Sequence, residues 1–519
     1  MSEVIAPRPR LPTETRLSLL AAWLGDRLIG GSPRSDSPPL DQPLDPIVTG
    51  VSLSSHRIVR GDLYAALPGA RVHGSRFARA AVDSGAVAIL TDAEGAGSAR
   101  DLGVPVLVVE RPRALLGALA ARVYDHPAES LRLVAVTGTA GKTTATRLAG
   151  SGLEHAGVPA AVVGTLGTRI RGREVPSALT TPEAPDLHAL FAVMREEGVR
   201  GAAMEVSSHA LVMGRVDGVV FDVAAFTNLG RDHLDFHADV EDYFSAKAGL
   251  FTAERARRGL VNIDDGYGQR LRREATIPLR TFSASGAEAD WRATDVVATP
   301  TGSRFTVVSP TGERIPAQAP IPGAFNVANA LVAVAALAEV GFDAAAVADG
   351  IASSSGVPGR FEQVRAGQDF LALVDYAHKP DAVTAALEAL AAQTPGRLIV
   401  ILGAGGDRDP GKREVMGEVA ARLADVLVVT DDNPRTEDPA LIRAAVLAGA
   451  EGVSARERAE THECADRREA VRLAVSLATS GDTVVVAGKG HESGQDVAGT
   501  VHPFDDRVVL RDAVEALPS

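Results

Sequence analysis

The sequence predicts an α/β protein with about three domains and sheets that are rich in parallel strands. The chain has 519 residues, and a domain typically holds roughly 100–200 residues. In the segment "LRLVAVTGTAGKTTAT", an apolar stretch runs into a glycine-rich turn and then into a helical pattern. The last third of the chain alternates strand-like and helix-like segments, which is typical of a parallel, doubly wound sheet. With 45% apolar and 23% charged residues, the chain can bury large cores.

Residues 1–45 predict a short amphipathic helix followed by a linker. Leu17, Leu20 and Leu24 fall on one helical face, and residues 31–46 are rich in proline and serine. We expect the first domain at residues 46–130, where short strands such as "VAIL" and "VPVLVV" mix with alanine-rich helices.

The second domain is expected at residues 131–356 and the third at residues 357–519. The third is the more regular. Its strands "FLALV", "RLIVIL", "VLVVT" and "TVVVA" are separated by helical segments, with two helices in succession before the last strand.

Four polar segments follow the strands of the third domain directly. They are "DYAHKPDA", "GAGGDRDPGKR", "DDNPRTEDP" and "GKGHESGQ". The carboxyl ends of parallel strands share one edge of a sheet, where ligands bind in open α/β folds. We therefore expect these segments to form one composite site.

The composition excludes several classes of protein. The net charge of −13 argues against nucleic acid as the main partner, so an anionic small molecule would need a local basic cluster. The single cysteine, Cys464, allows no disulfide within the chain and favours a reducing, cytoplasmic setting. No signal peptide and no apolar run of about 20 residues is expected in the sequence.

The segment "VAVTGTAGKTTAT" predicts a site for nucleotide phosphates. Backbone N–H groups from Gly138 to Lys142 can surround phosphate oxygens at a helix N-terminus. Lys142 supplies positive charge to the terminal phosphates, and the Thr143 hydroxyl suits Mg²⁺. Only two residues separate Gly138 from Gly141, whereas the usual pattern has four.

Two further segments offer metal ligands. "GAAMEVSSHALVMGR" ends a strand at Glu205, which is either a Mg²⁺ ligand or a solvated strand terminus. "FTNLGRDHLDFH" offers His233 beside Asp232 and Asp235, and a lone histidine of this kind is either a ligand or a structural residue.

Eleven ordered segments resemble those of one protein family, the Mur ligases, and within it the MurE type. They are "TGTAGKTT", "TTPEAPDL", "MEVSSHAL", "FTNLGRDHLDFH", "YFSAKAGLF", "PGAFNVANALVAVA", "VPGRFE", "VDYAHKPDA", "GGDRDPGKR", "DNPRTEDP" and "AGKGHE". The resemblance extends from about Gly50 to the C-terminus.

The resemblance implies a domain for a UDP-sugar, a central P-loop ATPase domain and a Rossmann-like C-terminal domain that binds a diamino acid. It also implies a reaction in cytoplasmic peptidoglycan precursor synthesis. ATP phosphorylates the D-Glu γ-carboxylate of UDP-N-acetylmuramoyl-L-Ala-D-Glu, and the amine of meso-2,6-diaminopimelate attacks the acyl phosphate. The implied partners are these small molecules, acted on by a monomer, with no nucleic acid and no membrane insertion.

The resemblance also assigns residues to ATP and to metal. The implied catalytic residues are Lys142, Glu205, His233 and Lys247. The implied Mg²⁺ ligands are Thr143, Glu205, His233 and Lys247, the last as a carbamate formed with CO₂. Alone, Lys247 would be interpreted as a surface lysine of a helix. The implied ATP-binding residues are Gly138, Thr139, Ala140, Gly141, Lys142, Thr143, Thr144, Asn326, Arg360, Asp375 and His378.

The resemblance assigns a second set of residues to the UDP-sugar dipeptide: Leu53, Ser55, Thr180, Thr181, Ser207, Met213 and Arg215. Two positions depart from the family pattern. Ala140 stands where the family usually has asparagine, and Met213 replaces a residue that is often polar.

The diaminopimelate-binding residues that the resemblance implies are Arg413, Asp432, Asn433, Pro434, Arg435, Gly488 and Glu492. Arg435 offers a planar, bidentate fork to the distal carboxylate of this amino acid, and Glu492 would receive its ammonium. L-lysine has no distal carboxylate and would leave Arg435 without its anion.

Three alternatives remain at this point. The L-lysine-adding branch of the same family is disfavoured by the intact "DNPR". A folylpolyglutamate synthase-like ligase is disfavoured by the N-terminal domain. A P-loop scaffold without catalysis would have no use for Lys142, Glu205, His233 and Lys247 together.

Overall fold

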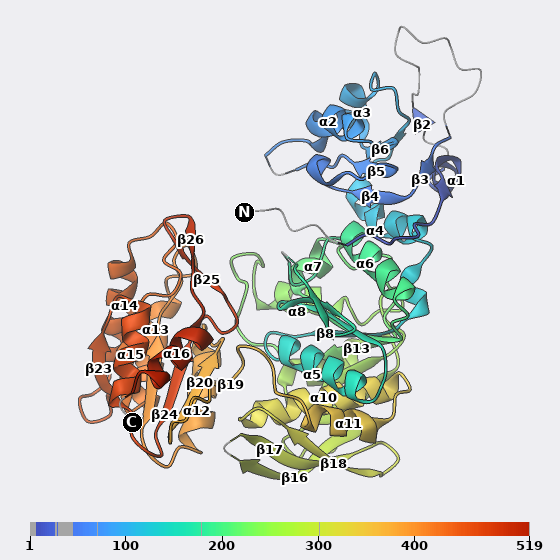
Figure 1. Ribbon diagram of the computed structural model, residues 1–519. Coiled ribbons are helices and arrows are strands. Elements are labelled where there is room, and N and C mark those ends of the chain that lie inside the picture. The colour runs from blue at the N-terminus through green and yellow to red at the C-terminus, as the bar shows by residue number, and fades with distance from the viewer. Residues whose placement is uncertain are drawn as a thin grey trace.

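The protein consists of three α/β domains, each built on its own sheet (Figure 1). The structure, a computed structural model, describes residues 7–25, 28–29, 45–69, 71–177, 179–299 and 301–517. In Figure 1 the blue N-terminal domain lies above the green and yellow central domain, and the orange and red C-terminal domain lies to the left of the central one. Most of the predicted linker, residues 31–44, lies outside the described residues.

The N-terminal domain holds a five-stranded sheet in the order β2-β7-β6-β5-β4, parallel except for β2. The predicted N-terminal helix is confirmed as α1, and its Leu17 and Leu20 are buried against the sheet. The strands are β1 Thr15–Arg16, β2 Leu28–Ile29, β3 Ile47–Val48, β4 Gly50–Ser52, β5 Asp62–Ala65, β6 Ala88–Thr91 and β7 Val106–Val108. The helices are α1 Leu17–Trp23, α2 Ala78–Asp83, α3 Ala93–Ala99 and α4 Pro112–Val123, with 3₁₀ turns at Ser55–Arg57, Gly74–Phe77 and Pro127–Ser130.

The central domain holds an eleven-stranded sheet in the order β11-β10-β9-β12-β8-β13-β14-β15-β16-β17-β18. The strands from β9 to β16 in this order run parallel, and antiparallel strands close both edges. The strands are β8 Arg132–Thr137, β9 Ala160–Gly164, β10 Gly167–Ile170, β11 Arg173–Val175, β12 Gly201–Glu205, β13 Val223–Phe226, β14 Gly259–Asn262, β15 Leu279–Ser283, β16 Trp291–Thr299, β17 Gly302–Val308 and β18 Arg314–Ala319. The helices are α5 Lys142–His155, α6 Ala184–Glu196, α7 Ser208–Val212, α8 Val240–Ala248, α9 Gly266–Glu274, α10 Ala324–Glu339 and α11 Ala344–Ala352.

The C-terminal domain has a six-stranded sheet in the order β19-β20-β24-β21-β22-β23, parallel except for β19. The doubly wound prediction is confirmed, and the four predicted polar segments follow β20, β24, β21 and β22 at one edge. The strands are β19 Glu362–Gln363, β20 Leu371–Asp375, β21 Leu398–Leu402, β22 Val426–Val429, β23 Glu460–Glu463, β24 Thr483–Ala487, β25 Gly494–Val497 and β26 Thr500–Pro503. The helices are α12 Pro380–Ala391, α13 Lys412–Leu423, α14 Pro439–Glu451, α15 Arg467–Leu477 and α16 Asp506–Glu515.

One strand of this sheet escaped the sequence-based prediction, which placed two helices in direct succession. Between α14 and α15 the chain adds β23, Glu460–Glu463, in parallel to β22. Its residues "ETHE" are polar and not buried, because β23 lies at the edge of the sheet. Such a strand carries neither an apolar run nor an alternation of apolar and polar residues.

The two outer domains are attached to the central domain very differently. Among the described residues, three salt bridges join the N-terminal and central domains: Arg57–Asp186, Arg113–Glu183 and Asp125–Arg195. Within the described parts of the chain, the ion pair between Lys379 and Asp232 is the one salt bridge between the C-terminal and central domains. An apolar contact near the connection, between the rings of Phe325 and Phe361, accompanies it.

Searching the described residues for a helix both long and apolar enough to cross a bilayer finds none.

A buried ion pair organises the binding edge of the C-terminal sheet. Arg467 and Asp506 are fully buried and share two hydrogen bonds of 2.8 Å. The same guanidinium donates to the carbonyls of Ala487, at the end of β24, and Asp431, after β22. Two helices and two strand ends are therefore joined at one group.

Replacing Lys379 by methionine is expected to loosen the C-terminal domain. A partly exposed ion pair stabilises by about 1 kcal/mol or less, so the domain positions would shift several-fold in population. Small-angle X-ray scattering at low and high salt would measure this. The wild-type radius of gyration should grow with salt as the pair is screened, and the variant should be larger at low salt and insensitive to salt. Asp232→Asn should behave like Lys379→Met, because it removes the other half of the same ion pair. Arg258→Met breaks an ion pair inside the central domain and should behave like wild type.

Replacing Arg467 by methionine should destabilise the C-terminal domain by about 3–5 kcal/mol, because Asp506 would be left as an uncompensated buried charge. Hydrogen exchange of peptides from β22 and β24 would report the loss of protection. The double variant Arg467→Met with Asp506→Met should recover most of it, since no buried charge remains. Unchanged exchange in the single variant would contradict this role of the pair.

Candidate functional site

The glycine-rich turn after β8 forms a tight loop at the start of α5. Gly138 and Gly141 have φ values of 146° and 87°. A Cβ at Gly138 would lie 2.0 Å from Thr227 Oγ1, and one at Gly141 would lie 2.3 Å from Asn329 Oδ1. Both positions therefore require glycine, and the first turn of α5 has backbone N–H groups that lack an acceptor within the helix.

Lys142, the first residue of α5, lies folded over this turn. Its Nζ donates to the carbonyls of Gly138 and Thr139 at 2.8 and 2.9 Å. Burial lowers the pKa of the Lys142 ammonium to about 8, although Glu205 opposes the shift. Neutral carbonyls compensate a buried cation only partly, so an incoming anion would be a stronger partner.

Glu205 lies at the end of β12 and is buried, so the interpretation as a solvated strand terminus is wrong. Its Oε2 accepts hydrogen bonds from the hydroxyls of Thr143 at 3.0 Å and Thr165 at 3.1 Å. Its Oε1 accepts from the backbone N–H of Thr165 at 2.8 Å. The carboxylate and the Thr143 hydroxyl thus stand together beside the phosphate loop.

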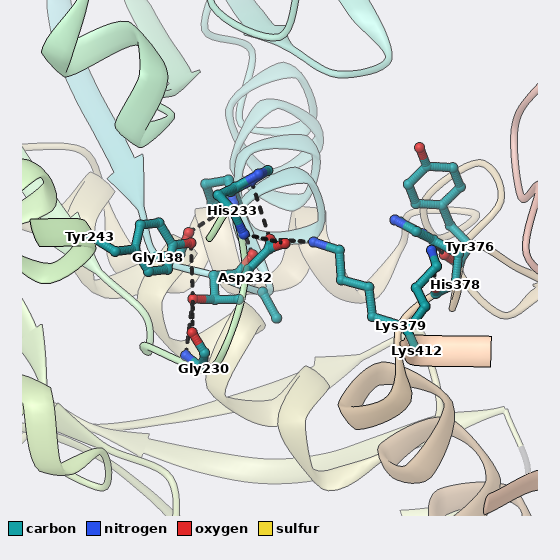
Figure 2. Close-up of polar contacts among 12 residues, drawn as sticks. Gly138, Gly230, Asp232, His233, Tyr243, Tyr376, His378, Lys379 and Lys412 are labelled. Carbon is teal, nitrogen blue, oxygen red and sulfur yellow. Dashed lines mark hydrogen bonds and ion pairs between the residues drawn. The ribbon is translucent and has the colours of Figure 1, made fainter. Parts of the chain in front are cut away.

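Asp232 and His233 follow β13 and face the same loop (Figure 2). His233 has a φ of 54°, and its Nε2 lies 3.2 Å from Asp232 Oδ2. Burial lowers the pKa of His233 to about 4, so the ring is neutral at physiological pH. Although burial favours the acid form of Asp232, the Lys379 ammonium lowers its pKa below the ordinary value.

Figure 2 shows Lys379 reaching from the C-terminal domain to Asp232. Lys379 directly precedes α12. Lys412 lies nearby, with its Nζ donating to the carbonyl of His378 at 3.0 Å. The C-terminal domain therefore brings two ammonium groups toward the phosphate loop.

Lys247 belongs to α8 and is 1% exposed, which excludes the surface-lysine interpretation. Its Nζ donates to the Gly138 carbonyl at 2.8 Å and lies 4.4 Å from the centre of the Tyr243 ring. Burial, together with the Lys142 charge, lowers the pKa of Lys247 well below its ordinary value. The Tyr243 hydroxyl in turn lies 3.1 Å from Thr139 Oγ1.

The residues assigned to the UDP-sugar dipeptide form two groups. In the central domain, Thr181 Oγ1 accepts from the N–H of Ser207 and donates to the Glu205 carbonyl. Arg215 pairs with Glu183 at 2.9 Å and donates to Thr181 O at 3.4 Å. Thr180 adjoins Thr165, with 3.1 Å between the hydroxyls. The other group, the half-buried Leu53 and the buried Ser55, lies in the N-terminal domain.

The two departures from the family pattern have neighbours in the structure. The N–H and C=O of Ala140 are both bound by the side-chain amide of Asn228, at 2.9 and 3.2 Å. The Met213 sulfur lies 3.4 Å from Arg215 Nη2. An amide is thus present beside the phosphate loop, supplied by a different residue.

The remaining residues assigned to ATP lie on α10 and around the domain connection. Asn326 accepts from Asn329 at 2.9 Å, next to Gly141. The Arg360 guanidinium stacks over the Tyr376 ring at 4.6 Å. Burial raises the pKa of Asp375, although Arg360 and backbone N–H groups oppose it. Burial lowers the pKa of His378 to about 4.

The residues assigned to the diamino acid meet at the carboxyl edge of the C-terminal sheet. Asn433 Nδ2 donates to Glu492 Oε2 at 2.9 Å, which joins the loops after β22 and β24. Gly488 has a φ of 115°, and a Cβ there would lie 2.5 Å from Asp432 Oδ2. The carbonyl oxygen of Pro434 lies close to Gly406, because a Cβ added at Gly406 would stand only 2.0 Å from it.

Arg435 and Arg413 differ in their partners. Arg435 has a φ of 51°, and its Nη1 donates to the carbonyl of Gly406 at 2.6 Å. None of the carboxylates that the structure describes lies within salt-bridge distance of this guanidinium. Arg413 instead contacts both oxygens of Glu437 at 2.9 Å, so much of its charge is already compensated.

Sequence reasoning missed several residues of the site, including Lys379, Lys412 and Lys489. A compositional signal could have found them. Only five of the 53 lysine and arginine residues are lysines. All five lie at the phosphate loop or at the facing edge of the C-terminal sheet: Lys142, Lys247, Lys379, Lys412 and Lys489.

Three family models match the chain in succession. Residues 47–124 match the Mur ligase family catalytic domain, residues 136–337 the Mur ligase middle domain, and residues 359–490 the Mur ligase glutamate ligase domain.

Individual relatives match over nearly the whole chain. A Streptomyces avermitilis protein named UDP-N-acetylmuramoyl-L-alanyl-D-glutamate--2,6-diaminopimelate ligase is 53% identical, covering 98% of each chain. A Corynebacterium glutamicum protein of the same name is 51% identical, covering 90% of this chain and 92% of its own. A solved structure with that name aligns with a TM-score of 0.66 at 34% identity, covering 93% of this chain and 96% of its own. The chain belongs to the Mur ligase family.

Proposed function

We propose that this Mur ligase joins meso-2,6-diaminopimelate to the D-Glu γ-carboxylate of UDP-N-acetylmuramoyl-L-Ala-D-Glu, with conversion of ATP to ADP and phosphate. The names of the Streptomyces and Corynebacterium relatives support this substrate pair. The observation that carries the choice of amino acid is Arg435, a guanidinium at the binding edge without a carboxylate partner among the described residues, beside Asn433 and Glu492.

The phosphate loop, residues 138–144, would bind ATP through N–H groups at the start of α5, because those of Thr139 and Ala140 already donate to Asn228. Lys142 would exchange its two carbonyl contacts for phosphate oxygens. Asn326, Arg360, Asp375 and His378 would surround the rest of the nucleotide. The solved fold neighbours include a Mur ligase named as a complex with ADP, which supports the binding of an adenine nucleotide.

The residues near the loop fit Mg²⁺. Clusters of three or more His, Cys, Asp or Glu able to hold a metal do not occur in the described chain. Mg²⁺ is usually held by one or two carboxylates together with substrate phosphates, so such a cluster is not needed. Glu205 and the Thr143 hydroxyl would hold the ion with neutral His233 and a Lys247 carbamate nearby. When bound, the ion neutralises phosphate charge.

Lys247 is suited to carbamate formation. Its lowered pKa favours the free amine, which attacks CO₂ to form R–NH–COO⁻ and release one proton. The nitrogen keeps an N–H for the Gly138 carbonyl. The carbamate is an anion, whereas the ammonium form of Lys247 would repel the Lys142 ammonium.

The chemistry proceeds in two displacements. A γ-carboxylate oxygen of D-Glu attacks the γ-phosphorus of ATP, and the bond to the β-phosphate oxygen breaks. The amine nitrogen of the diamino acid then attacks the acyl carbon, the C–O bond to phosphate breaks, and the nitrogen loses a proton. Thr181, Ser207 and Arg215 would hold the dipeptide, while Lys142 and Lys379 stabilise the charge on the transferred phosphoryl group.

The alternative functions account for fewer features of the structure. L-lysine would leave the Arg435 fork without an anion. A folate-type ligase would have no use for the N-terminal domain, where Leu53 and Ser55 would meet uridine. The free Cys464 agrees with a reducing cytoplasm, and we expect the chain to act there as a monomer.

Purified protein with Mg-ATP and UDP-N-acetylmuramoyl-L-Ala-D-Glu is expected to release phosphate only when meso-diaminopimelate is added. Parallel reactions with L-lysine and L-ornithine should remain at background, because each leaves Arg435 unpaired. Preferential turnover of L-lysine would retain the ligase and contradict the role of Arg435. No turnover with any amino acid would contradict the proposed reaction.

Protein equilibrated with ¹³C-labelled CO₂ is expected to show one carbamate carbon signal in its NMR spectrum. The signal should disappear in Lys247→Met, because that variant has no amine at the position. Lys412→Met serves as the matched control and should keep the signal. A wild-type spectrum without a carbamate resonance, at saturating bicarbonate, would count against the modification.

A further inference from the structure

Lys489 is a buried lysine that the reaction described above does not use. It follows β24 in a turn between Gly488 and Gly490, whose φ values are 115° and 54°. Its side chain is fully buried, whereas Glu492 beside it remains partly exposed. A buried cation is stable only where several acceptors surround it.

The Lys489 ammonium joins two side chains of the diamino-acid site. Its Nζ donates to Asn433 Oδ1 and to Glu492 Oε2, both at 3.0 Å. The backbone N–H of Asp496 also donates to Asn433 Oδ1, at 2.9 Å. Asn433 Nδ2 completes the ring of contacts by donating to Glu492 Oε2 at 2.9 Å.

These contacts allow only one orientation of the Asn433 amide. Oδ1 receives two donors, and a rotated amide would point its NH₂ group at an ammonium and a backbone N–H. In the observed orientation one N–H of Asn433 remains for a ligand. On Glu492, Oε2 is occupied by both neighbours, and Oε1 has no hydrogen-bond donor among the residues that the structure describes.

The site therefore has a fixed polarity. Donors stand on one side, namely the remaining N–H of Asn433 and the Arg435 guanidinium, whose nearest protein acceptor is a neutral carbonyl. An acceptor, Glu492 Oε1, stands on the other. A free α-amino acid end carries a carboxylate and an ammonium on one carbon, and its charges match this arrangement.

The identity of the residue supports this role. The chain uses arginine at 48 of its 53 lysine and arginine positions. Arginine has a planar fork, whereas lysine is a compact point charge with three donors. Only the latter can contact Asn433 Oδ1 and Glu492 Oε2 from inside a tight glycine turn, where a Cβ at Gly490 would already lie 2.7 Å from Tyr376 Cβ.

We propose that Lys489 is a positioning residue that fixes the Asn433 amide and the Glu492 carboxylate, and thereby sets the selectivity for an amino acid with a second zwitterionic end. This inference rests on the proposed function. Lys489 would touch no substrate itself and would act through Asn433 and Glu492. Its loss leaves Asn433 Oδ1 with the Asp496 N–H and Glu492 Oε2 with the Asn433 amide, so both side chains are held less firmly.

The test compares Lys489→Met with wild type in phosphate release. The KM for meso-diaminopimelate should rise about tenfold, as expected for a lost charged hydrogen bond. The ratio of kcat/KM for meso-diaminopimelate to that for L-lysine should fall by a similar factor. The KM for ATP should stay within about twofold, since Lys142 and its loop are untouched.

A double-mutant cycle shows whether Lys489 acts through Asn433. Asn433→Ala with Lys489→Met should lose less than the two single effects combined, because Lys489 then has only Glu492 left to hold. Lys489→Arg should fail to restore the wild-type KM. Arg472→Met, which removes an exposed cation of α15 in the same domain, is the matched control and should leave the KM unchanged.

The outcomes separate the two proposals. An unchanged KM for meso-diaminopimelate in Lys489→Met overturns the inference and leaves the proposed function intact. Equal rises in the KM of ATP and of meso-diaminopimelate, together with a lower melting temperature, also overturn it, since they indicate a purely structural lysine. Wild-type protein without turnover of meso-diaminopimelate overturns the proposed function and this inference with it.

Discussion

Ammonium groups that are to bind a polyphosphate must be held close together while the anion is absent, although they repel one another. This constraint shapes the centre of the molecule. The Gly138 carbonyl accepts hydrogen bonds from both Lys142 and Lys247, so a half-buried and a buried amine converge on one oxygen. Asp232 holds a third, Lys379. Each of these amines can exchange its present partner, the Gly138 carbonyl or Asp232, for a phosphate oxygen or a carbamate oxygen.

The same constraint explains how the domains are joined. Lys379 reaches the centre only from the C-terminal domain, and it provides the salt bridge between that domain and the central one. The N-terminal domain, by contrast, is anchored by several ion pairs and by the packing of α4 on α6. Under the proposed function, the UDP-sugar would thus meet the more firmly attached domain, and the amino acid would bind to the domain with the weaker attachment.

Much of this architecture could be predicted from the sequence, for identifiable reasons. Parallel strands end at one edge, so the segments containing Asp375, Asn433 and Glu492 had to converge. The edge strand β23 could not be predicted, because its exposed residues carry no apolar pattern. Neither could the pairing of Arg413 with Glu437, nor the reach of Lys379 to Asp232, because both depend on contacts between segments distant in sequence.

The orientation of Asn433 illustrates the remaining gap. The sequence indicates an amide that gives and accepts hydrogen bonds, whereas the structure leaves it only a donor for the ligand. Composition holds information that the motifs do not, since all five lysines of this arginine-rich chain lie at the phosphate loop or at the facing edge of the C-terminal sheet.

The placement of the five lysines has a practical consequence for chemical labelling. A reagent that acylates or reductively methylates ε-amines would find all of its lysine targets at the centre of the molecule, namely the phosphate loop and the facing edge of the C-terminal sheet. The extent of lysine modification would therefore measure the accessibility of that centre. A ligand that covers this region would lower the extent of lysine modification, and no lysine elsewhere would obscure the change.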